Sequence, residues 1–154
     1  KMRSVSRRLK SEKGLGLVIV DYLQLMAPTH ARHADNLVQQ VTEISRGLKS
    51  IARELNIPVI AVSQLSRAVD QREGRMPRLS DLRESGSIEQ DADIVMLIHP
   101  KDHGPDTPPN EQNIVEIIVA KHRNGPTGSV GLFFDKNKAS FSSLEKRNED
   151  TGGY

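Results

Sequence analysis

The sequence has no cysteine and no tryptophan, and only 3% of its 154 residues are aromatic. Without cysteine, the chain can form neither disulfides nor thiolate metal sites, and it is compatible with a reducing compartment. So few aromatic rings argue against a single-strand binder that stacks bases on aromatic side chains. If the chain binds nucleic acid, we therefore expect it to contact phosphates instead.

Long apolar runs are also missing. No run approaches the roughly 20 residues that span a bilayer, and no signal-peptide pattern opens the chain. These absences predict a cytoplasmic protein with no membrane partner. The remaining composition, 36% hydrophobic and 27% charged, is that of one globular domain with its own core. The net charge of +2 is mildly basic and does not by itself indicate nucleic-acid binding.

An apolar run rich in β-branched residues begins at Gly14 and ends at a single carboxylate, Asp21. Such runs are typical of buried parallel strands that are covered by helices on both faces. Open α/β sheets bind ligands at the carboxyl ends of their strands. An aspartate there is the Walker B acid of nucleotide-hydrolysing folds, which helps to hold Mg²⁺. The run alone is equally compatible with a core strand whose aspartate caps the next turn.

The rest of the pattern alternates helices and strands. Residues 37–55 form the clearest helix, because apolar residues recur there three and four apart, and an apolar strand at 58–62 follows it. Strand, helix and strand in this order form a βαβ unit. We predict an α/β fold with a mostly parallel sheet flanked by helices and a C-terminal antiparallel hairpin. Its other elements are a basic helix at 1–13, a short helix opened by a Ser87–Gln90 capping box, and strands at 92–98, 114–120 and 130–134.

Two polar segments are candidates for contacting an anionic partner. Residues 65–90 are rich in arginine and poor in apolar residues, and a loop of this length in a compact domain is functional or mobile. Within it, Arg83 lies close in sequence to small hydroxyl residues and to Gly86, whose backbone can approach a ligand closely. Lys121 and Arg123 are two residues apart at the tip of strand 114–120, so both should project from one side.

Four segments, taken in order, resemble the DnaB family of bacterial replicative hexameric helicases. Residues 16–26 (GLVIVDYLQLM) are similar to the family's Walker B segment, and residues 60–67 (IAVSQLSR) to the motif that follows it. Residues 80–93 (SDLRESGSIEQDAD) resemble its most distinctive segment, and residues 120–128 (AKHRNGPTG) its arginine-finger hairpin. Each segment alone is a weak signal, but four in the family's order across nearly all of residues 1–144 form a specific one.

The resemblance implies the carboxyl-terminal half of a RecA-like P-loop motor domain that uses ATP and Mg²⁺. Asp21 would help to hold Mg²⁺, and Gln64 would sense the γ-phosphate and couple it to the DNA loops. Lys121 and Arg123 would act in trans, stabilising charge on the phosphoryl group in the neighbouring subunit's site, an effect of about 10³–10⁵ in rate. The implied DNA contacts, made to phosphates, are Arg83, Glu84 through its backbone, and Gly86.

The resemblance also implies how the parent protein works. It would be a homohexameric ring that hydrolyses ATP, translocates on single-stranded DNA and unwinds the duplex at the replication fork. Primase and a helicase loader would bind other parts of that protein, in a bacterial or phage-like replisome. A RecA-like recombination or clock ATPase is an alternative, which the SDLRESGSIEQDAD segment disfavours.

The chain departs from the family because it lacks G-x-x-x-x-G-K-S/T, the Walker A loop whose backbone N–H groups and lysine cradle phosphates. The family's catalytic glutamate, which lies upstream of the matched segments, is missing too, so no residue is assigned as general base. With a first residue, Lys1, that is not methionine, these absences predict a fragment. Residues 1–144 would be a motor-domain portion and residues 145–154 a flexible tail. By itself the chain should not hydrolyse ATP, and would serve only as a binding or assembly module.

Overall fold

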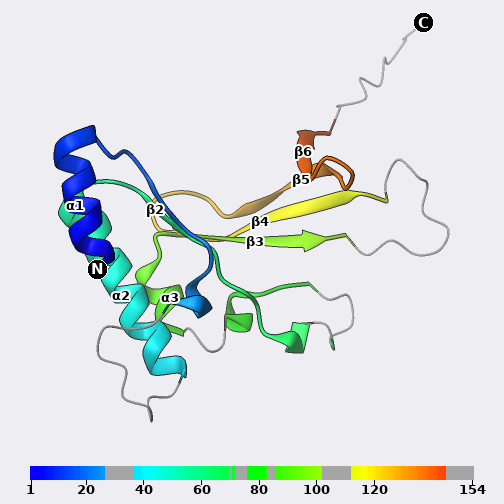
Figure 1. The fold of residues 1–154 in the computed structure, drawn as a ribbon. Coiled ribbons are helices and arrows are strands. Elements are labelled where there is room, and N and C mark those ends of the chain that lie inside the picture. The colour runs from blue at the N-terminus through cyan, green and yellow to red at the C-terminus, as the bar shows by residue number, and fades with distance from the viewer. Residues whose placement is uncertain (27–36, 70, 72–75, 83–85, 102–111, 145–154) are drawn as a thin grey trace, which may run out of the picture.

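The computed structural model describes residues 1–26, 37–69, 71, 76–82, 86–101 and 112–144. Three helices gather at one end of the molecule, and a long antiparallel sheet extends away from them (Figure 1). None of the described helices is long and apolar enough to cross a membrane. The helices are α1 (Met2–Lys13), α2 (Leu37–Leu55) and α3 (Gly86–Asp91), with 3-10 turns η1 (Leu23–Leu25), η2 (Arg67–Val69) and η3 (Leu79–Asp81).

The strands form two sheets. The first contains β1 (Val18–Val20) and β2 (Val59–Ala61), which run parallel with Val20 opposite Ala61, so the predicted βαβ unit is present. The second is antiparallel and has the order β3-β4-β5-β6. Its strands are β3 (Ile94–Pro100), β4 (Ile114–His122), β5 (Gly128–Asp135) and β6 (Ser140–Ser143). The predicted antiparallel hairpin is the β4–β5 pair.

The α/β class is confirmed, but the mostly parallel sheet is not what the described strands form. Among them, only β1 and β2 pair in parallel, whereas β3, β4, β5 and β6 pair antiparallel. The segment between β3 and β4 accounts for part of this difference. A parallel connection usually carries a crossover helix, and residues 101–113 contain three prolines, which disfavour a helix.

Helix α2 provides most of the core, and its bounds are those that the apolar spacing predicts. Its inner stripe is buried, and Ile44 and Leu48 pack against Val20 and Leu23 of the β1 segment. Arg7 of α1 bonds Glu54 of α2, and this bond ties the first helix to the second. Helix α1 ends where the sequence predicts, because Gly14 adopts the left-handed conformation (φ 70°) and donates its N–H to Lys10 O.

The antiparallel sheet is buried on one face only. Along β3, Val95 and Leu97 pack into a second cluster with Leu82, whereas the residues that alternate with them are exposed. Ile88 of α3 contacts both core clusters and so joins the two sheets. The prediction that helices cover both faces of the β1 strand is wrong for the described residues, because Ile19 is 63% exposed. Helix α2 packs on one face of this pair, and no described element packs against the Ile19 side chain.

Candidate functional site

Two predicted site residues lie together at one end of the parallel sheet. Asp21 directly follows β1, and Gln64 lies three residues after the end of β2. Two backbone hydrogen bonds of 2.9 Å continue the pairing past the strand ends, from Val62 N–H to Val20 O and from Leu23 N–H to Val62 O. Because parallel strands end at the same edge, both side chains are presented there, and Asp21 is exposed. The peptide bond that follows Asp21 is cis.

Gln24 links these two strand ends, a role that the sequence analysis missed. Its Nε2 donates to Ser63 Oγ at 3.0 Å and to Gln64 O at 3.3 Å, and the Gln64 N–H lies 3.4 Å from Gln24 Oε1. The amide therefore bonds both the N–H and the C=O of Gln64 and fixes that backbone relative to the end of β1. The only signal in the sequence is a polar side chain between Leu23 and Leu25, both apolar.

The strand-end group suits a magnesium ion in part. A carboxylate and an amide oxygen at one edge are hard ligands, and Mg²⁺ in nucleotide sites takes only one or two carboxylates, with phosphates and waters completing its shell. Asp21 is exposed and so free to take this part. No group of three or more metal-ligating side chains occurs among the described residues. The chain's own contribution is therefore a half-site that a nucleotide must complete.

The predicted finger cations lie on a different element. Lys121 is near the end of β4, and its Nζ donates to the backbone carbonyl of Glu89 in α3. Arg123 follows β4, and its NH2 donates to Gln90 O at 3.2 Å. Both cations thus contact successive carbonyls in the last turn of α3, where the helix dipole favours positive charge. Within the described part of the chain, no hydrogen bond or ion pair joins either cation to Asp21 or Gln64.

Asp93 forms a charged cluster with these cations, and the sequence analysis did not assign it. Its Oδ1 lies 3.2 Å from Arg123 NH1, and its Oδ2 lies 2.5 Å from Lys49 Nζ. The hydrogen bond from Lys49 lowers the pKa of the Asp93 carboxyl below its usual 3.8, with help from the charges of Lys49, Arg123 and Arg53. The carboxylate is therefore ionised at neutral pH.

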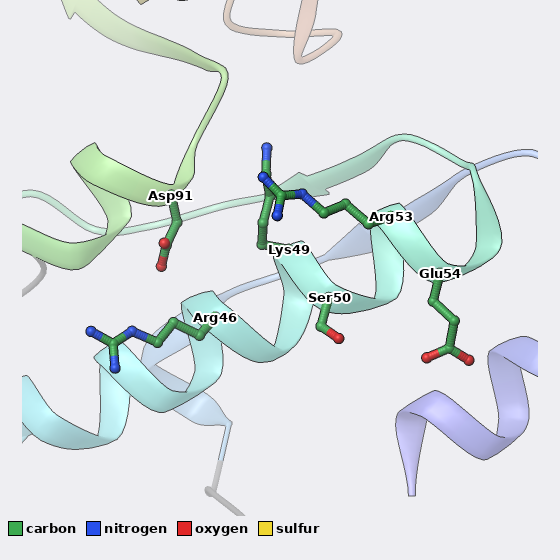
Figure 2. Close-up of a pocket in the computed structure, with 6 residues that line it drawn as sticks. All are labelled: Arg46, Lys49, Ser50, Arg53, Glu54 and Asp91. Carbon is green, nitrogen blue, oxygen red and sulfur yellow. The ribbon is translucent and has the colours of Figure 1, made fainter.

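An open depression of about 520 Å³ lies beside this cluster on α2. In Figure 2, Lys49 and Arg53 extend from the same part of α2, and Asp91 points down from α3 toward that helix. Ser45 Oγ donates to Asp91 Oδ2 at 2.8 Å, so α2 and the end of α3 are held together here as well. The residues that line the depression are Arg46, Lys49, Ser50, Arg53, Glu54 and Asp91.

Two of the predicted DNA contacts, Arg83 and Glu84, lie outside the described residues. The third, Gly86, is the first residue of α3. The segment before them is anchored, because the buried Asp81 accepts from Arg78 N–H at 2.7 Å and its own carbonyl accepts from Ser66 N–H at 3.0 Å. The chain therefore enters this region from a fixed point and leaves it as a helix.

The short helix predicted near Ser87 is present, but its predicted capping box is wrong. The helix begins one residue earlier, at Gly86, so Ser87 lies inside the first turn and cannot be the N-cap. Its Oγ is buried and has no hydrogen-bond partner. A residue inside the helix points its side chain along the helix surface, away from the free N–H groups that an N-cap serves.

The chain is similar in sequence to known helicases. The family model described as DnaB-like helicase C-terminal domain matches residues 1–143. Replicative DNA helicase DnaC of Bacillus subtilis (strain 168) is 55% identical over 151 residues, which are 98% of this chain and 33% of that protein. Replicative DNA helicase DnaB of Geobacillus stearothermophilus is 53% identical over 146 residues, 95% of this chain and 32% of that protein. The chain thus spans about a third of the length of these relatives.

Solved structures agree in fold. A helicase ATPase domain of known structure superposes with a TM-score of 0.83 at 47% identity, over 94% of this chain and 50% of that one. A DnaB-like replicative helicase, solved in a study of its interactions with primase, gives a TM-score of 0.82 at 48% identity, over 94% of this chain and 34% of that one. The described sheets and helices are therefore part of a RecA-like ATPase fold.

Proposed function

The chain belongs to the family of DnaB-like helicase C-terminal domains, and we propose that it is part of an ATP-dependent replicative DNA helicase. The whole protein translocates on single-stranded DNA and unwinds the duplex at the replication fork. Residues 1–144 are the carboxyl-terminal portion of its motor domain, and residues 145–154 are a tail. It works in the cytoplasm of a bacterium or in a phage-like replisome.

The observation that carries this proposal is the pairing of Asp21 and Gln64 at the carboxyl edge of two adjacent parallel strands. ATP and Mg²⁺ bind at this edge, where the Asp21 carboxylate holds the metal directly or through water. Gln64 contacts the γ-phosphate, and its backbone moves as one unit with Gln24 and Ser63 because of their hydrogen bonds. When bound, the metal neutralises charge that develops on the phosphates.

Lys121 and Arg123 act on the nucleotide of a neighbouring subunit. Their contacts with α3 keep them apart from the strand-end group of their own chain, which supports action in trans. Cations at the transferring phosphoryl group stabilise the charge that spreads over its oxygens. The active site then lies between subunits of a homohexameric ring, and assembly is part of the chemistry.

DNA and protein partners follow from the same family membership. The phosphates of one DNA strand contact Arg83, the backbone of Glu84, and Gly86, because cations and backbone N–H groups recognise phosphates without reading sequence. Primase and a helicase loader bind other parts of the parent protein. One structural relative was solved in a study of its interactions with primase, which supports the first of these partners.

A catalytic test uses the full-length protein. Arg123→Ala should lower DNA-stimulated ATP hydrolysis by about 10³–10⁵, because the transferring phosphoryl group loses a cation. Lys138→Ala is the matched control, since that side chain is 79% exposed and pairs with Asp135 at the far end of the sheet. Intact hydrolysis in the Arg123 variant would refute the assignment of the finger.

The 154-residue chain by itself is a second case, because it contains no Walker A loop. We propose that alone it neither hydrolyses ATP nor binds it with micromolar affinity, and acts as a binding or assembly module. Calorimetric titration of Mg²⁺–ATP into the isolated chain tests this. Saturable binding in the micromolar range would show that the phosphate cradle is not needed, and would overturn this part of the proposal.

A further inference from the structure

Asp93 and Arg123 face each other across the end of the β3–β4 pair. In the register of this pair Ile94 lies opposite His122, so the residue before β3 and the residue after β4 are neighbours. The Arg123 N–H donates to the Asp93 carbonyl at 2.8 Å. Backbone pairing thus brings the two side chains together, whatever their charges contribute.

The guanidinium of Arg123 is held by its own chain without being used up. NH1 lies 3.2 Å from Asp93 Oδ1, and NH2 donates to Gln90 O at 3.2 Å. A guanidinium has five N–H donors in a planar fork, so these two contacts leave other donors of the fork available. The Arg123 side chain is 44% exposed, which leaves these donors open to a molecule outside the chain.

The Asp93 carboxylate is in turn anchored to the core. Its second oxygen bonds Nζ of Lys49, whose side chain is largely buried on α2. Leu48, the preceding residue of α2, is part of the main core cluster. The two cations on this carboxylate therefore come from elements far apart in sequence, the helix α2 and the hairpin that carries Arg123.

We propose that Asp93 is a positioning residue for the finger cation Arg123, with Lys49 as its anchor on α2. The Asp93 carboxylate and the Gln90 carbonyl together fix the guanidinium plane, so that the remaining N–H groups are presented to the phosphoryl group of the neighbouring subunit. This inference rests on the proposed function of Arg123. Asp93 itself does not touch the nucleotide.

The expected kinetic signature follows from this indirect role. Without the carboxylate, Arg123 keeps its charge but samples more rotamers, so fewer encounters have the geometry of the transition state. Transition-state stabilisation falls while ground-state binding of ATP by the other half-site remains. The kcat for ATP hydrolysis should therefore drop with little change in KM.

The experiment uses the full-length hexamer carrying Asp93→Ala. DNA-stimulated kcat should fall by about 10- to 100-fold, the cost of misplacing a catalytic group by about 1 Å, and KM for ATP should change by less than about twofold. In the double variant Asp93→Ala/Arg123→Ala, hydrolysis should be no slower than in Arg123→Ala alone. Asp135→Asn, which alters a carboxylate at the other end of the sheet, is the matched control and should leave kcat unchanged.

The outcomes separate this inference from the function on which it rests. If Arg123→Ala leaves hydrolysis intact, the proposed function of the finger fails. If Arg123→Ala is defective but Asp93→Ala keeps its kcat, or if the two defects multiply in the double variant, Asp93 does not act through Arg123 and the inference alone fails. Should Asp93→Ala not assemble, Asp93→Asn, which keeps an oxygen acceptor, is tested in the same cycle and should lower kcat by about tenfold.

Discussion

The Asp93 carboxylate is surrounded by three cations, Lys49, Arg53 and Arg123, that come from two elements distant in sequence. The hydrogen bond from Lys49 is the main cause of its lowered pKa, and partial burial opposes that effect. The side chain is 57% exposed, so water and salt screen the attraction. Each such pair is worth about 0.2–1 kcal/mol in the free energy of unfolding, which is small for stability even where geometry matters for function.

The lowered pKa of Asp93 predicts a pH-dependent part of stability. A carboxyl whose folded-state pKa lies below its unfolded value of 3.8 stabilises the folded chain above that pH, and this contribution disappears as pH falls through the lowered pKa. Asp93→Asn should therefore be less stable than the original chain at pH 7, by about 0.2–1 kcal/mol. The two should converge under acid conditions. Denaturant unfolding between neutral and acidic pH measures this difference.

Lys49→Met provides the control for that prediction, because it removes the cation whose hydrogen bond lowers the pKa most. In this background Asp93→Asn should change stability much less at neutral pH. A stability difference between the original chain and its Asp93→Asn variant that stays constant with pH, or that survives the loss of Lys49, would show that the pair does not act by charge.

Residue types and spacing predict some site residues and not others. Asp21 and Gln64 follow apolar strands, and strand ends are where α/β folds place ligands. Gln24 bonds a residue 40 positions away, and Lys49 bonds one 44 positions away. Their neighbours depend on strand pairing and helix packing, which no local pattern encodes. Positioning residues of this kind therefore became visible only in the structure.

At the scale of elements, the β4–β5 hairpin carries the finger cations and has a tight turn at Gly125. A Cβ added at Gly125 would lie 2.5 Å from Nδ1 of His122, far inside van der Waals contact. That imidazole nitrogen also lies 3.3 Å from Pro126 O, a contact that spans the turn. Small size at this position thus lets the ring fold over the turn beside Lys121 and Arg123.

Gly125→Ala should therefore destabilise the chain, by about 1–3 kcal/mol if the ring cannot move away freely. Gly128→Ala is the matched control in the same hairpin, because a Cβ there meets no atom within 4 Å. Thermal unfolding of both variants measures the difference. Adding His122→Ala to Gly125→Ala should recover part of the loss, and full additivity of the two changes would refute the clash.

Elements were predicted best where burial alone determines them. Helix α2 has one continuous apolar stripe, so its bounds are in the sequence. The direction of strand pairing is different, because an apolar run shows that a strand is buried and not which neighbour it pairs with. Strand β6 is mostly polar and exposed, and backbone pairing with β5 holds it, so it has no apolar signal. Of the site, the sequence located the two cations and the strand-end pair, but not the α3 platform that the cations contact.

At the scale of the molecule, the described residues leave apolar faces uncovered on both sheets. Exposed large side chains of the parallel pair are Ile19, Ile60 and Val62, and those of β3 are Ile94, Met96 and Ile98. The opposite faces of the same strands are buried by α2 and by the Leu82 cluster. Uncovered strand faces of this size promote association between chains.

The isolated chain should therefore self-associate or be marginally stable. Its melting temperature should rise with protein concentration over a roughly hundredfold range, because association stabilises the folded state by mass action. The double change Met96→Lys/Ile98→Lys places charge on the exposed side of β3 and leaves Val95 and Leu97 in the core. It should shift the sedimentation profile toward monomer and remove the concentration dependence of melting. A chain that is monomeric before the change, with a high melting temperature that is independent of concentration, would show that these faces are stable when exposed to water.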